Sequence, residues 1–218
     1  MRIRLLGHAS FLVTASSGAK IVFDPYEPGG YGGAMRYGRL QEPADAVVIT
    51  HDHADHNYAR GVPGNPQVVK GAGAHSAAGL ALRGIAAKHD TAGGSERGDD
   101  TVFCVEVDAV RLCHLGDLGH QLSEAQVAEI GPVDVLLIPV GGTFTIDADG
   151  ATQVVRALNP RITIPMHFKT PKVDFPLAPV DGFLAGKSDV LREGVSEITV
   201  TRESLAAQPQ VVVLEPAL

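Results

Sequence analysis

Short apolar runs separated by turn residues recur along the whole chain and predict a strand-rich fold. Three of these runs lie near the start, at Arg2–Leu6, Phe11–Thr14 and Lys20–Phe23, and predict an antiparallel meander. The continuous apolar runs Ala46–Ile49 and Val133–Val140 predict strands that are buried.

Capping and turn residues place helices between these strands. Ser123 to Gln126 form a capping box that predicts the start of a helix, and Gly131 with Pro132 predicts its end. Helices are also predicted at Ala74–Leu82, where His75 lies near the start, and at Ala151–Leu158 and Val180–Ala185. Further strands are predicted at Gln67–Lys70, Gly84–Lys88, Ile162–Pro165, Ile198–Thr201 and Val211–Leu214.

Residues 101–115 predict a β-hairpin that turns at Asp108 and Ala109. The register places Glu106 opposite Arg111, and this pair of opposite charges supports it. The same register places Cys104 opposite Cys113. Because directly opposed strand positions strain a disulfide, we expect two packed thiols.

Composition narrows the class of protein. A 218-residue chain with 44% hydrophobic and 20% charged residues is typical of a soluble globular protein, and we expect residues 1–218 to form a single domain. The net charge of −7 argues against a nucleic-acid partner that needs a basic surface. We find neither a signal peptide nor an apolar run long enough to span a membrane, so we expect a cytoplasmic protein with reduced cysteines.

The segment His51–His56 contains three histidines and two aspartates and follows an apolar strand through Thr50. Imidazole nitrogens and carboxylate oxygens are ligands that Zn²⁺ and similar divalent ions take up. At a sharp turn, His51 and His53 can point one way while Asp55 and His56 point another, which favours two metal ions side by side. A polar turn that happens to be rich in histidine is the alternative.

The pattern His-x-His-x-Asp-His after an apolar strand resembles the signature of the metallo-β-lactamase fold superfamily. Further segments resemble the branch that contains L-ascorbate 6-phosphate lactonase-like proteins, phospholipases D of the N-acyl phosphatidylethanolamine type and many Zn-dependent hydrolases. These segments are Leu6–Ala9, Phe23–Pro25, His114–His120 and Pro165–Phe168. The resemblance covers essentially the whole chain and implies an α/β (α+β) fold, a four-layer αββα sandwich with metal ligands at strand ends.

The resemblance also implies a ligand set for two metals. The first metal would be held by His51, His53 and His89, and the second by Asp55, His56 and His167, with Asp117 bridging the two. Asp55 and Asp117 are therefore the predicted catalytic residues.

Other residues near these segments are candidates for the surroundings of the metals. The resemblance makes His8 a neighbour of the active site, and Asp24 is either a turn residue or an acceptor that orients a ligand histidine. His120 is either a supporting or a substrate-facing residue, whereas His114 is predicted to be a hydrogen-bonded core histidine. The loop around Thr143 could present backbone amides to an anion, or could be a plain turn.

The least regular stretch is Tyr26–Pro43, which contains five glycines and two prolines. Its composition predicts a mobile loop beside the site. Tyr31, Arg36, Tyr37 and Arg39 are candidate substrate contacts, although each residue taken singly is more typical of a solvated loop.

Two divalent metal ions would supply hydrolytic chemistry. A water or hydroxide between them would have its pKa lowered to about 7 and would need no serine or cysteine nucleophile. The second residue of the pattern is His53, whereas flavodiiron-type oxygen reductases of the same fold tend to carry an acidic residue there. This favours hydrolysis and Zn²⁺, with Mn²⁺ or Fe²⁺ as alternatives.

Three functions remain open from the sequence. The first is hydrolysis of an ester, lactone or phosphoester of a small cytoplasmic metabolite. The second is a phosphodiesterase that acts on a lipid or nucleotide, although the chain has no Trp and no evident amphipathic insertion for a lipid surface. The third is a non-catalytic metal-binding module, against which the complete ligand set argues. A homo-oligomer is compatible with all three.

Overall fold

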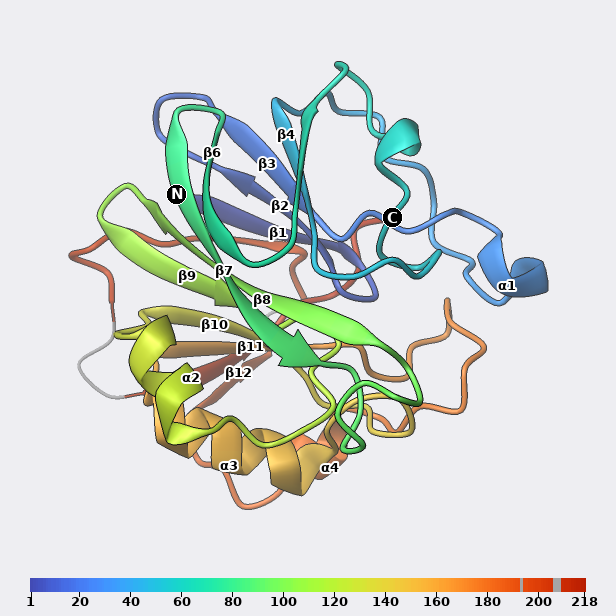
Figure 1. Ribbon diagram of the computed structural model, residues 1–218, viewed down its shortest axis with the longest axis vertical. Coiled ribbons are helices and arrows are strands. Elements are labelled where there is room, and N and C mark those ends of the chain that lie inside the picture. Colours follow the sequence, from blue (N-terminus) through green and yellow to red (C-terminus); the bar gives the residue numbers. More distant parts are fainter. Residues whose placement is uncertain (193, 206–208) are drawn as a thin grey trace.

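A computed structural model describes residues 1–192, 194–205 and 209–218, which form two facing β-sheets (Figure 1). The first sheet has six strands in the order β13-β1-β2-β3-β4-β5, and the second has eight in the order β12-β14-β11-β10-β9-β8-β7-β6. The strands of the first sheet are β1 (Arg2–Gly7), β2 (Ser10–Thr14), β3 (Lys20–Phe23), β4 (Ala46–Ile49), β5 (Gln67–Lys70) and β13 (Glu197–Thr199). Those of the second are β6 (Gly73–Ala77), β7 (Leu80–Lys88), β8 (Asp99–Val107), β9 (Val110–His114), β10 (Val135–Pro139), β11 (Ile162–Met166), β12 (Val190–Arg192) and β14 (Gln210–Val213).

The two outer layers differ in kind. Helices α2 (Glu124–Ile130), α3 (Ala148–Leu158) and α4 (Asp181–Leu184) cover the outer face of the eight-stranded sheet (Figure 1). The outer face of the six-stranded sheet is covered mainly by irregular chain that includes a 3₁₀ turn, Ala59–Gly61. The single turn α1 (Gly30–Gly33) projects to one side of the sandwich (Figure 1). The predicted four-layer order is confirmed, but one outer layer consists largely of loops.

Apolar side chains fill the space between the sheets. Phe11, Phe23 and Phe103 are fully buried there, because alternate residues of each strand face the opposite sheet. The predicted capping box is confirmed, since the hydroxyl of Ser123 accepts a hydrogen bond from the Gln126 amide. Asp147 caps α3 in a similar way, through a hydrogen bond from the Gly150 amide. Among the described residues, no helix is long and apolar enough to cross a membrane.

One predicted helix is wrong. Residues 74–82 form a β-hairpin made by β6 and the start of β7, with Ala78 and Gly79 both at positive φ in its two-residue turn. Seven residue pairs then join β7 to β8, from Leu82–Val105 to Lys88–Asp99. This pairing overrides the helix propensity of the small residues. The predicted hairpin of β8 and β9 is confirmed in its register.

The topology brings several chain segments to one edge of the sandwich. Strands β9, β10 and β11 are parallel, and β7 runs in the same direction because two antiparallel pairings separate it from β9. In the other sheet, β3 and β4 are parallel. The carboxyl ends of these strands therefore deliver the segments after them to a shared edge.

Candidate metal centre

Three histidines form the first group of candidate ligands. One nitrogen from each of His51, His53 and His89 lies within 4.8 Å of the others. The first two follow β4, and His89 follows β7 in the opposite sheet. The structure thus brings together the three residues that the sequence assigned to the first metal.

The second group lies beside the first. Ligand atoms of His8, Asp55, His56 and His167 also lie within 4.8 Å of one another. His8, from the β1–β2 turn, joins the three residues predicted for the second metal, and its ring centroid lies 4.0 Å from that of His167. His8 is therefore in the cluster itself and not only near it.

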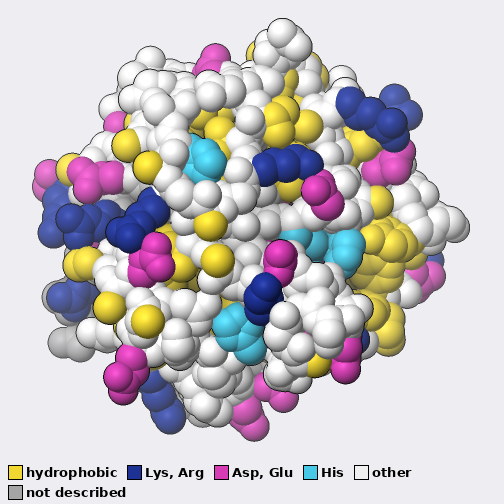
Figure 2. Space-filling model, in the orientation of Figure 1, with side chains coloured by type: hydrophobic (Ala, Val, Ile, Leu, Met, Phe, Trp, Pro, Cys, Tyr) yellow, Lys and Arg dark blue, Asp and Glu magenta, His cyan; other side chains and the backbone are white. Residues whose placement is uncertain are grey.

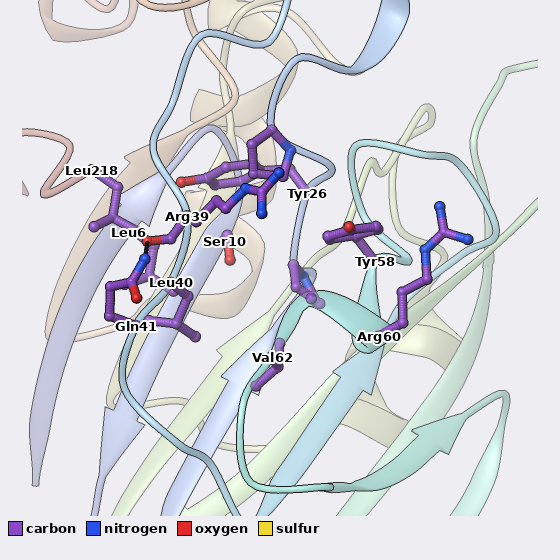
Figure 3. A pocket seen from close by; sticks show the side chains of 13 residues that line it. Leu6, Ser10, Tyr26, Arg39, Leu40, Gln41, Tyr58, Arg60, Val62 and Leu218 are labelled. Atoms are coloured by element: carbon purple, nitrogen blue, oxygen red, sulfur yellow. Dashed lines mark hydrogen bonds between the residues drawn. The ribbon is translucent and has the colours of Figure 1, made fainter.

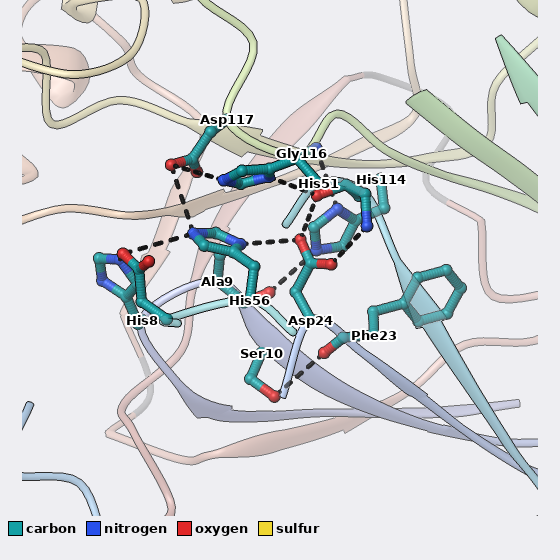
Figure 4. Close-up of polar contacts among 12 residues, drawn as sticks. His8, Ala9, Ser10, Phe23, Asp24, His51, His56, His114, Gly116 and Asp117 are labelled. Carbon is teal, nitrogen blue, oxygen red and sulfur yellow. Dashed lines mark hydrogen bonds and ion pairs between the residues drawn. The ribbon is translucent and has the colours of Figure 1, made fainter. Parts of the chain in front are cut away.

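Asp117 lies between the two groups. Its Oδ2 atom is 3.2 Å from Nε2 of His89 and 3.2 Å from Nε2 of His167, one residue from each group. The same oxygen is 3.3 Å from Nε2 of His56 (Figure 4). This is the position that a residue bridging two metal ions would take.

Asp24 binds His56 at the ring nitrogen that does not face the cluster. Its buried carboxylate accepts hydrogen bonds from the Thr50 amide (2.8 Å), the Thr50 hydroxyl (2.7 Å) and Nδ1 of His56 (2.9 Å; Figure 4). With Nδ1 donating to a carboxylate, Nε2 of His56 is left to face the cluster. Burial alone would raise the pKa of Asp24, but His56 holds it below its usual value. The orienting role considered for Asp24 fits this geometry.

Asp100 is a second buried support that the sequence analysis missed. Its Oδ1 atom is 3.5 Å from Nδ1 of His51 and accepts a hydrogen bond from the Asp117 amide at 3.3 Å. Gly116 makes this approach feasible, because a Cβ atom there would lie 2.2 Å from Oδ1 of Asp100. The available signal was an aspartate at the start of a strand next to the predicted metal edge.

His114 is the core histidine that the sequence predicted. It is fully buried, stacks on Phe23, and its Nε2 donates to the Ala9 carbonyl at 2.9 Å. Its Nδ1 accepts the Gly116 amide at 3.0 Å. His114 therefore steadies the turn that carries Asp117 and leaves no nitrogen for a metal.

The charges of the cluster depend on one another. Burial alone would lower the pKa of His56, but the carboxylates of Asp117, Asp55 and Asp24 raise it well above its usual value. Asp117 likewise raises the pKa of His89 against the effect of burial. Burial and the neighbouring His167 lower the pKa of His8 to about 4, so His8 is neutral at pH 7.

Buried ligand atoms without hydrogen-bond partners test whether metal ions fit here. Such atoms occur in the described residues His8, His51, His56, His89, Asp117 and His167. An unpaired buried polar atom costs about 1–3 kcal/mol, and an ion is one of the recognised reasons for one. The set consists of imidazole nitrogens and a carboxylate oxygen, so the residues fit divalent cations.

Two other candidates lie outside the cluster. His120 accepts the Lys88 amide at its Nε2 (3.1 Å), so it caps the end of β7 one residue before His89. The hydroxyl of Thr143 donates to the Pro176 carbonyl at 2.7 Å, and the nearby Phe144 amide donates to the Gly142 carbonyl. The amides of Phe144 and Thr145 are therefore used within a turn at Gly142.

The candidate substrate contacts from the 26–43 loop separate in the structure. Tyr31 lies beside the cluster, and its hydroxyl donates to Oδ1 of Asp55 at 3.0 Å. Tyr37 is buried and bonded to Thr170, and Arg36 pairs with Asp174. Arg39 lies elsewhere, so only Tyr31 of the four is placed to meet a substrate at the cluster.

The cavity beside the cluster has a volume of about 250 Å³. On the face shown in Figure 2, histidine side chains reach the surface next to a group of hydrophobic side chains. A larger cavity of about 340 Å³, on the outer side of the six-stranded sheet, contains Arg39 and none of the predicted ligands (Figure 3). A third cavity, of about 350 Å³, touches His51 and His53 but none of the predicted ligands of the second metal. The cavity of about 250 Å³ is lined by predicted ligands of both metals and by Asp117, so it is the candidate reaction site. It is lined by Tyr31, His53, Asp55, His89, Arg97, Asp117, Phe144, His167 and Phe175.

Three comparisons with known proteins find relatives of the same family. Residues 2–167 match the profile of a family described as the β-lactamase superfamily domain. A solved structure from Thermotoga maritima, described as a candidate Zn-dependent hydrolase of the metallo-β-lactamase superfamily, is 36% identical, with a TM-score of 0.80 and 98% of each chain covered. A UPF0173 metal-dependent hydrolase of Thermofilum pendens is 32% identical over 199 residues, 78% of this chain and 84% of the relative. Another, from Carboxydothermus hydrogenoformans, is 29% identical over 198 residues, 78% of this chain and 85% of the relative.

Proposed function

This chain belongs to the metallo-β-lactamase superfamily, and we propose that it is a metal-dependent hydrolase with a dinuclear centre. The substrate is a small molecule, and the bond that breaks is an ester, lactone or phosphoester bond. The two ions, for which Zn²⁺ is favoured, are held by His51, His53 and His89 on one side and by Asp55, His56 and His167 on the other, with Asp117 between them.

The charge of the buried carboxylates carries the proposal of two ions. Asp24, Asp55, Asp100 and Asp117 are all buried around the cluster. Within the described residues, no Lys or Arg side chain pairs with any of them, and their ionic partners are histidines. Uncompensated buried carboxylates are strongly destabilising. Histidines that bind a metal are neutral, so they no longer balance these charges. One divalent ion would then leave two of the four negative charges unbalanced, whereas two divalent ions would balance all four before a hydroxide forms.

When bound, the ions would polarise the substrate and lower the pKa of a water between them to about 7, which provides a hydroxide nucleophile. The residues of the chain supply the rest. Asp24 holds His56, and the Thr50 hydroxyl (3.0 Å) and Asp100 (3.5 Å) lie at Nδ1 of His51, so each ring turns its other nitrogen to the cluster. The Tyr31 hydroxyl is bonded to Asp55, and Tyr31 lines the cavity, where it can contact a substrate.

Cavity size favours a small substrate over a lipid. A volume of about 250 Å³ is below the range of about 300–1,000 Å³ that is usual for drug-sized ligands. A lipid phosphodiesterase would need a long apolar entrance. Lactones, small esters and small phosphodiesters all remain within this size.

Metal loading tests the centre independently of turnover. We expect two ions per chain and, because His56 and His89 have raised pKa values without metal, a release of protons on loading at pH 7. Calorimetric titration in buffers of different ionisation enthalpy measures both quantities. A stoichiometry of one, or loading without proton release, would contradict the dinuclear arrangement.

Turnover is tested on a panel of small lactones and esters and a panel of phosphodiesters. We expect metal-loaded protein to hydrolyse one panel, and both chelator treatment and Asp117→Ala to abolish that activity. Asp45→Asn is the matched control, because Asp45 is an exposed aspartate that bonds the Lys20 amide on the same sheet. Two bound metals with no turnover on either panel would leave a metal-binding module as the function.

A further inference from the structure

Four residues that line the reaction cavity are not candidate metal ligands. They are Tyr31, Arg97, Phe144 and Phe175. Arg97 is the one Lys or Arg side chain among the described lining residues, and the other three are aromatic. What these residues recognise determines which substrates the cavity accepts.

Arg97 is carried by the loop between β7 and β8, which also begins with the candidate ligand His89. The buried carboxylate of Asp90 organises this loop, since it accepts backbone amide hydrogen bonds from Ala92, Gly94, Glu96 and Arg97 at 2.7–3.0 Å. A loop bonded in this way has little freedom. The backbone of Arg97 therefore stands at a defined place beside the metal edge.

The guanidinium of Arg97 keeps donors available. Nη2 lies 3.4 Å from the Thr143 carbonyl and Nη1 lies 3.6 Å from the carboxylate of Glu96, so both contacts are long. The side chain of Glu96 is 64% exposed, which makes that pair weak and easily exchanged. A guanidinium has five N–H donors in a planar fork that matches a carboxylate or phosphate.

Aromatic rings form the wall next to this cation. The guanidinium carbon of Arg97 lies 5.8 Å from the ring centroid of Phe144. Phe175 makes edge contacts with both Phe144 and Tyr31, at centroid distances of 6.0 and 5.2 Å. Tyr31 is 52% exposed, which is unusual for so large an apolar side chain. The three rings, packed edge to face, form an apolar wall of the cavity that also contains the cation and the ligand histidines.

We propose that Arg97 is the anion-recognition residue of the reaction cavity, and that the substrates are small esters or lactones with a carboxylate or phosphate group remote from the bond that breaks. The reacting group lies at the metal edge, the body of the substrate lies on the aromatic wall, and the anionic end pairs with the guanidinium. This inference rests on the proposed hydrolase function and specifies its substrate class.

Two chromogenic esters that differ in one charge test the proposal. They are 4-nitrophenyl butyrate, which is neutral, and the mono-4-nitrophenyl ester of glutaric acid, which has a terminal carboxylate. We expect metal-loaded wild-type protein to prefer the anionic ester in kcat/KM. Because a charge-assisted pair is lost, Arg97→Gln should reduce kcat/KM for the anionic ester about 10- to 100-fold, mainly through KM, and change the neutral ester little.

Two further variants identify the cause of any change. Arg97→Lys keeps the charge but not the fork, so it should retain part of the preference. Arg83→Gln is the matched control, because Arg83 is an exposed arginine on β7 that pairs with Glu129 away from the cavity. Arg97→Gln should bind the same number of metal ions as wild type. An equal loss on both esters, or no loss on either, overturns the proposal.

A binding measurement separates this proposal from the hydrolase function. Calorimetry compares benzene-1,4-dicarboxylate with benzoate on metal-loaded protein, since only the dicarboxylate can meet the metals and Arg97 together. We expect the wild type, but not Arg97→Gln, to prefer the dicarboxylate. This preference without turnover of these esters or of either substrate panel would support anion recognition and refute the hydrolase. Turnover that does not depend on Arg97 would support the hydrolase and refute anion recognition by Arg97. If neither turnover nor the dicarboxylate preference is observed, both proposals are refuted.

Discussion

Asp24→Asn is the substitution that most directly tests how the centre is held. One carboxylate oxygen accepts the Thr50 amide, and the other accepts the Thr50 hydroxyl and Nδ1 of His56. An asparagine must replace one of these oxygens with an NH₂ group. If that group faces His56, a hydrogen bond survives only when Nδ1 becomes the acceptor and the ring proton moves to Nε2. That nitrogen is the one that faces Asp117 and would bind the metal.

The magnitude follows from what is lost. Removing a residue that orients a metal ligand typically lowers metal affinity about 10- to 100-fold, which is about 1.4–2.8 kcal/mol. Without metal, the loss of a buried hydrogen bond to a charged group should lower the free energy of unfolding by about 1.5–3 kcal/mol. Asp24 has a φ of 43°, and asparagine tolerates this region, so the backbone should remain in place.

Competition with a chromogenic chelator measures the affinity of each ion, and urea unfolding in excess chelator measures stability. We expect Asp24→Asn to weaken one of the two ions while the other changes less, because Asp24 bonds only the ligand His56 directly. Asp45→Asn, in which an exposed acceptor of the same sheet is altered, should change neither quantity. Unchanged affinity for both ions in Asp24→Asn would refute the orienting role.

Three further substitutions or treatments have defined outcomes. The pKa of His8 is lowered to about 4 in the folded protein, below the usual value of about 6.5. The free energy of unfolding should therefore be unaffected by His8 protonation above pH 6.5 and should fall as the pH falls from 6.5 towards 4. Measured by urea unfolding in excess chelator, the free energy of unfolding of wild type should fall by up to about 3 kcal/mol more across this pH range than that of His8→Gln. Gly119→Ala would place a Cβ atom 2.2 Å from the His89 carbonyl carbon, and the resulting backbone shift should lower the melting temperature and the metal affinity in the same samples. A hydrogen bond with Cys104 and burial raise the pKa of the Cys113 thiol. This thiol should therefore react with a thiol reagent far more slowly in native than in urea-unfolded protein. In the unfolded protein the reagent should count two free thiols per chain.

The predicted ligands came from strand ends, and the structure shows how strand ends bring these residues together. An apolar run that stops at a polar residue marks where a buried strand leaves the core. His51, His89, Asp117 and His167 all follow such runs. Parallel strands bring their carboxyl ends to one edge, so residues far apart in sequence gather without any local contact between them. The fold resemblance then indicated which of these ends belong together.

The errors and omissions have a common cause. Residues 74–82 have no apolar periodicity that distinguishes a helix from a strand, and the pairing of β6 with β7, extended by that of β7 with β8, decides between them. Arg97 lies in the loop between β7 and β8, and Asp100 follows it near the start of β8. An aspartate at the start of a strand was a weak signal for Asp100, and nothing in the local sequence marks Arg97 as functional. Their roles arise from contacts with His51 and with the aromatic wall. Tertiary contacts of this kind leave no pattern in the local sequence.

The histidines show how environment, and not residue type, separates structural from metal-binding roles. His114 and His120 each use both ring nitrogens in hydrogen bonds with backbone groups, and His75 bonds the Gly71 carbonyl. Buried ring nitrogens without hydrogen-bond partners occur instead in the described residues His8, His51, His56, His89 and His167. A buried nitrogen left unpaired is destabilising, so a fold retains several together only if something else satisfies them. Divalent cations would satisfy these nitrogens and would also balance the carboxylates around them, so charge and hydrogen bonding point to the same candidate centre.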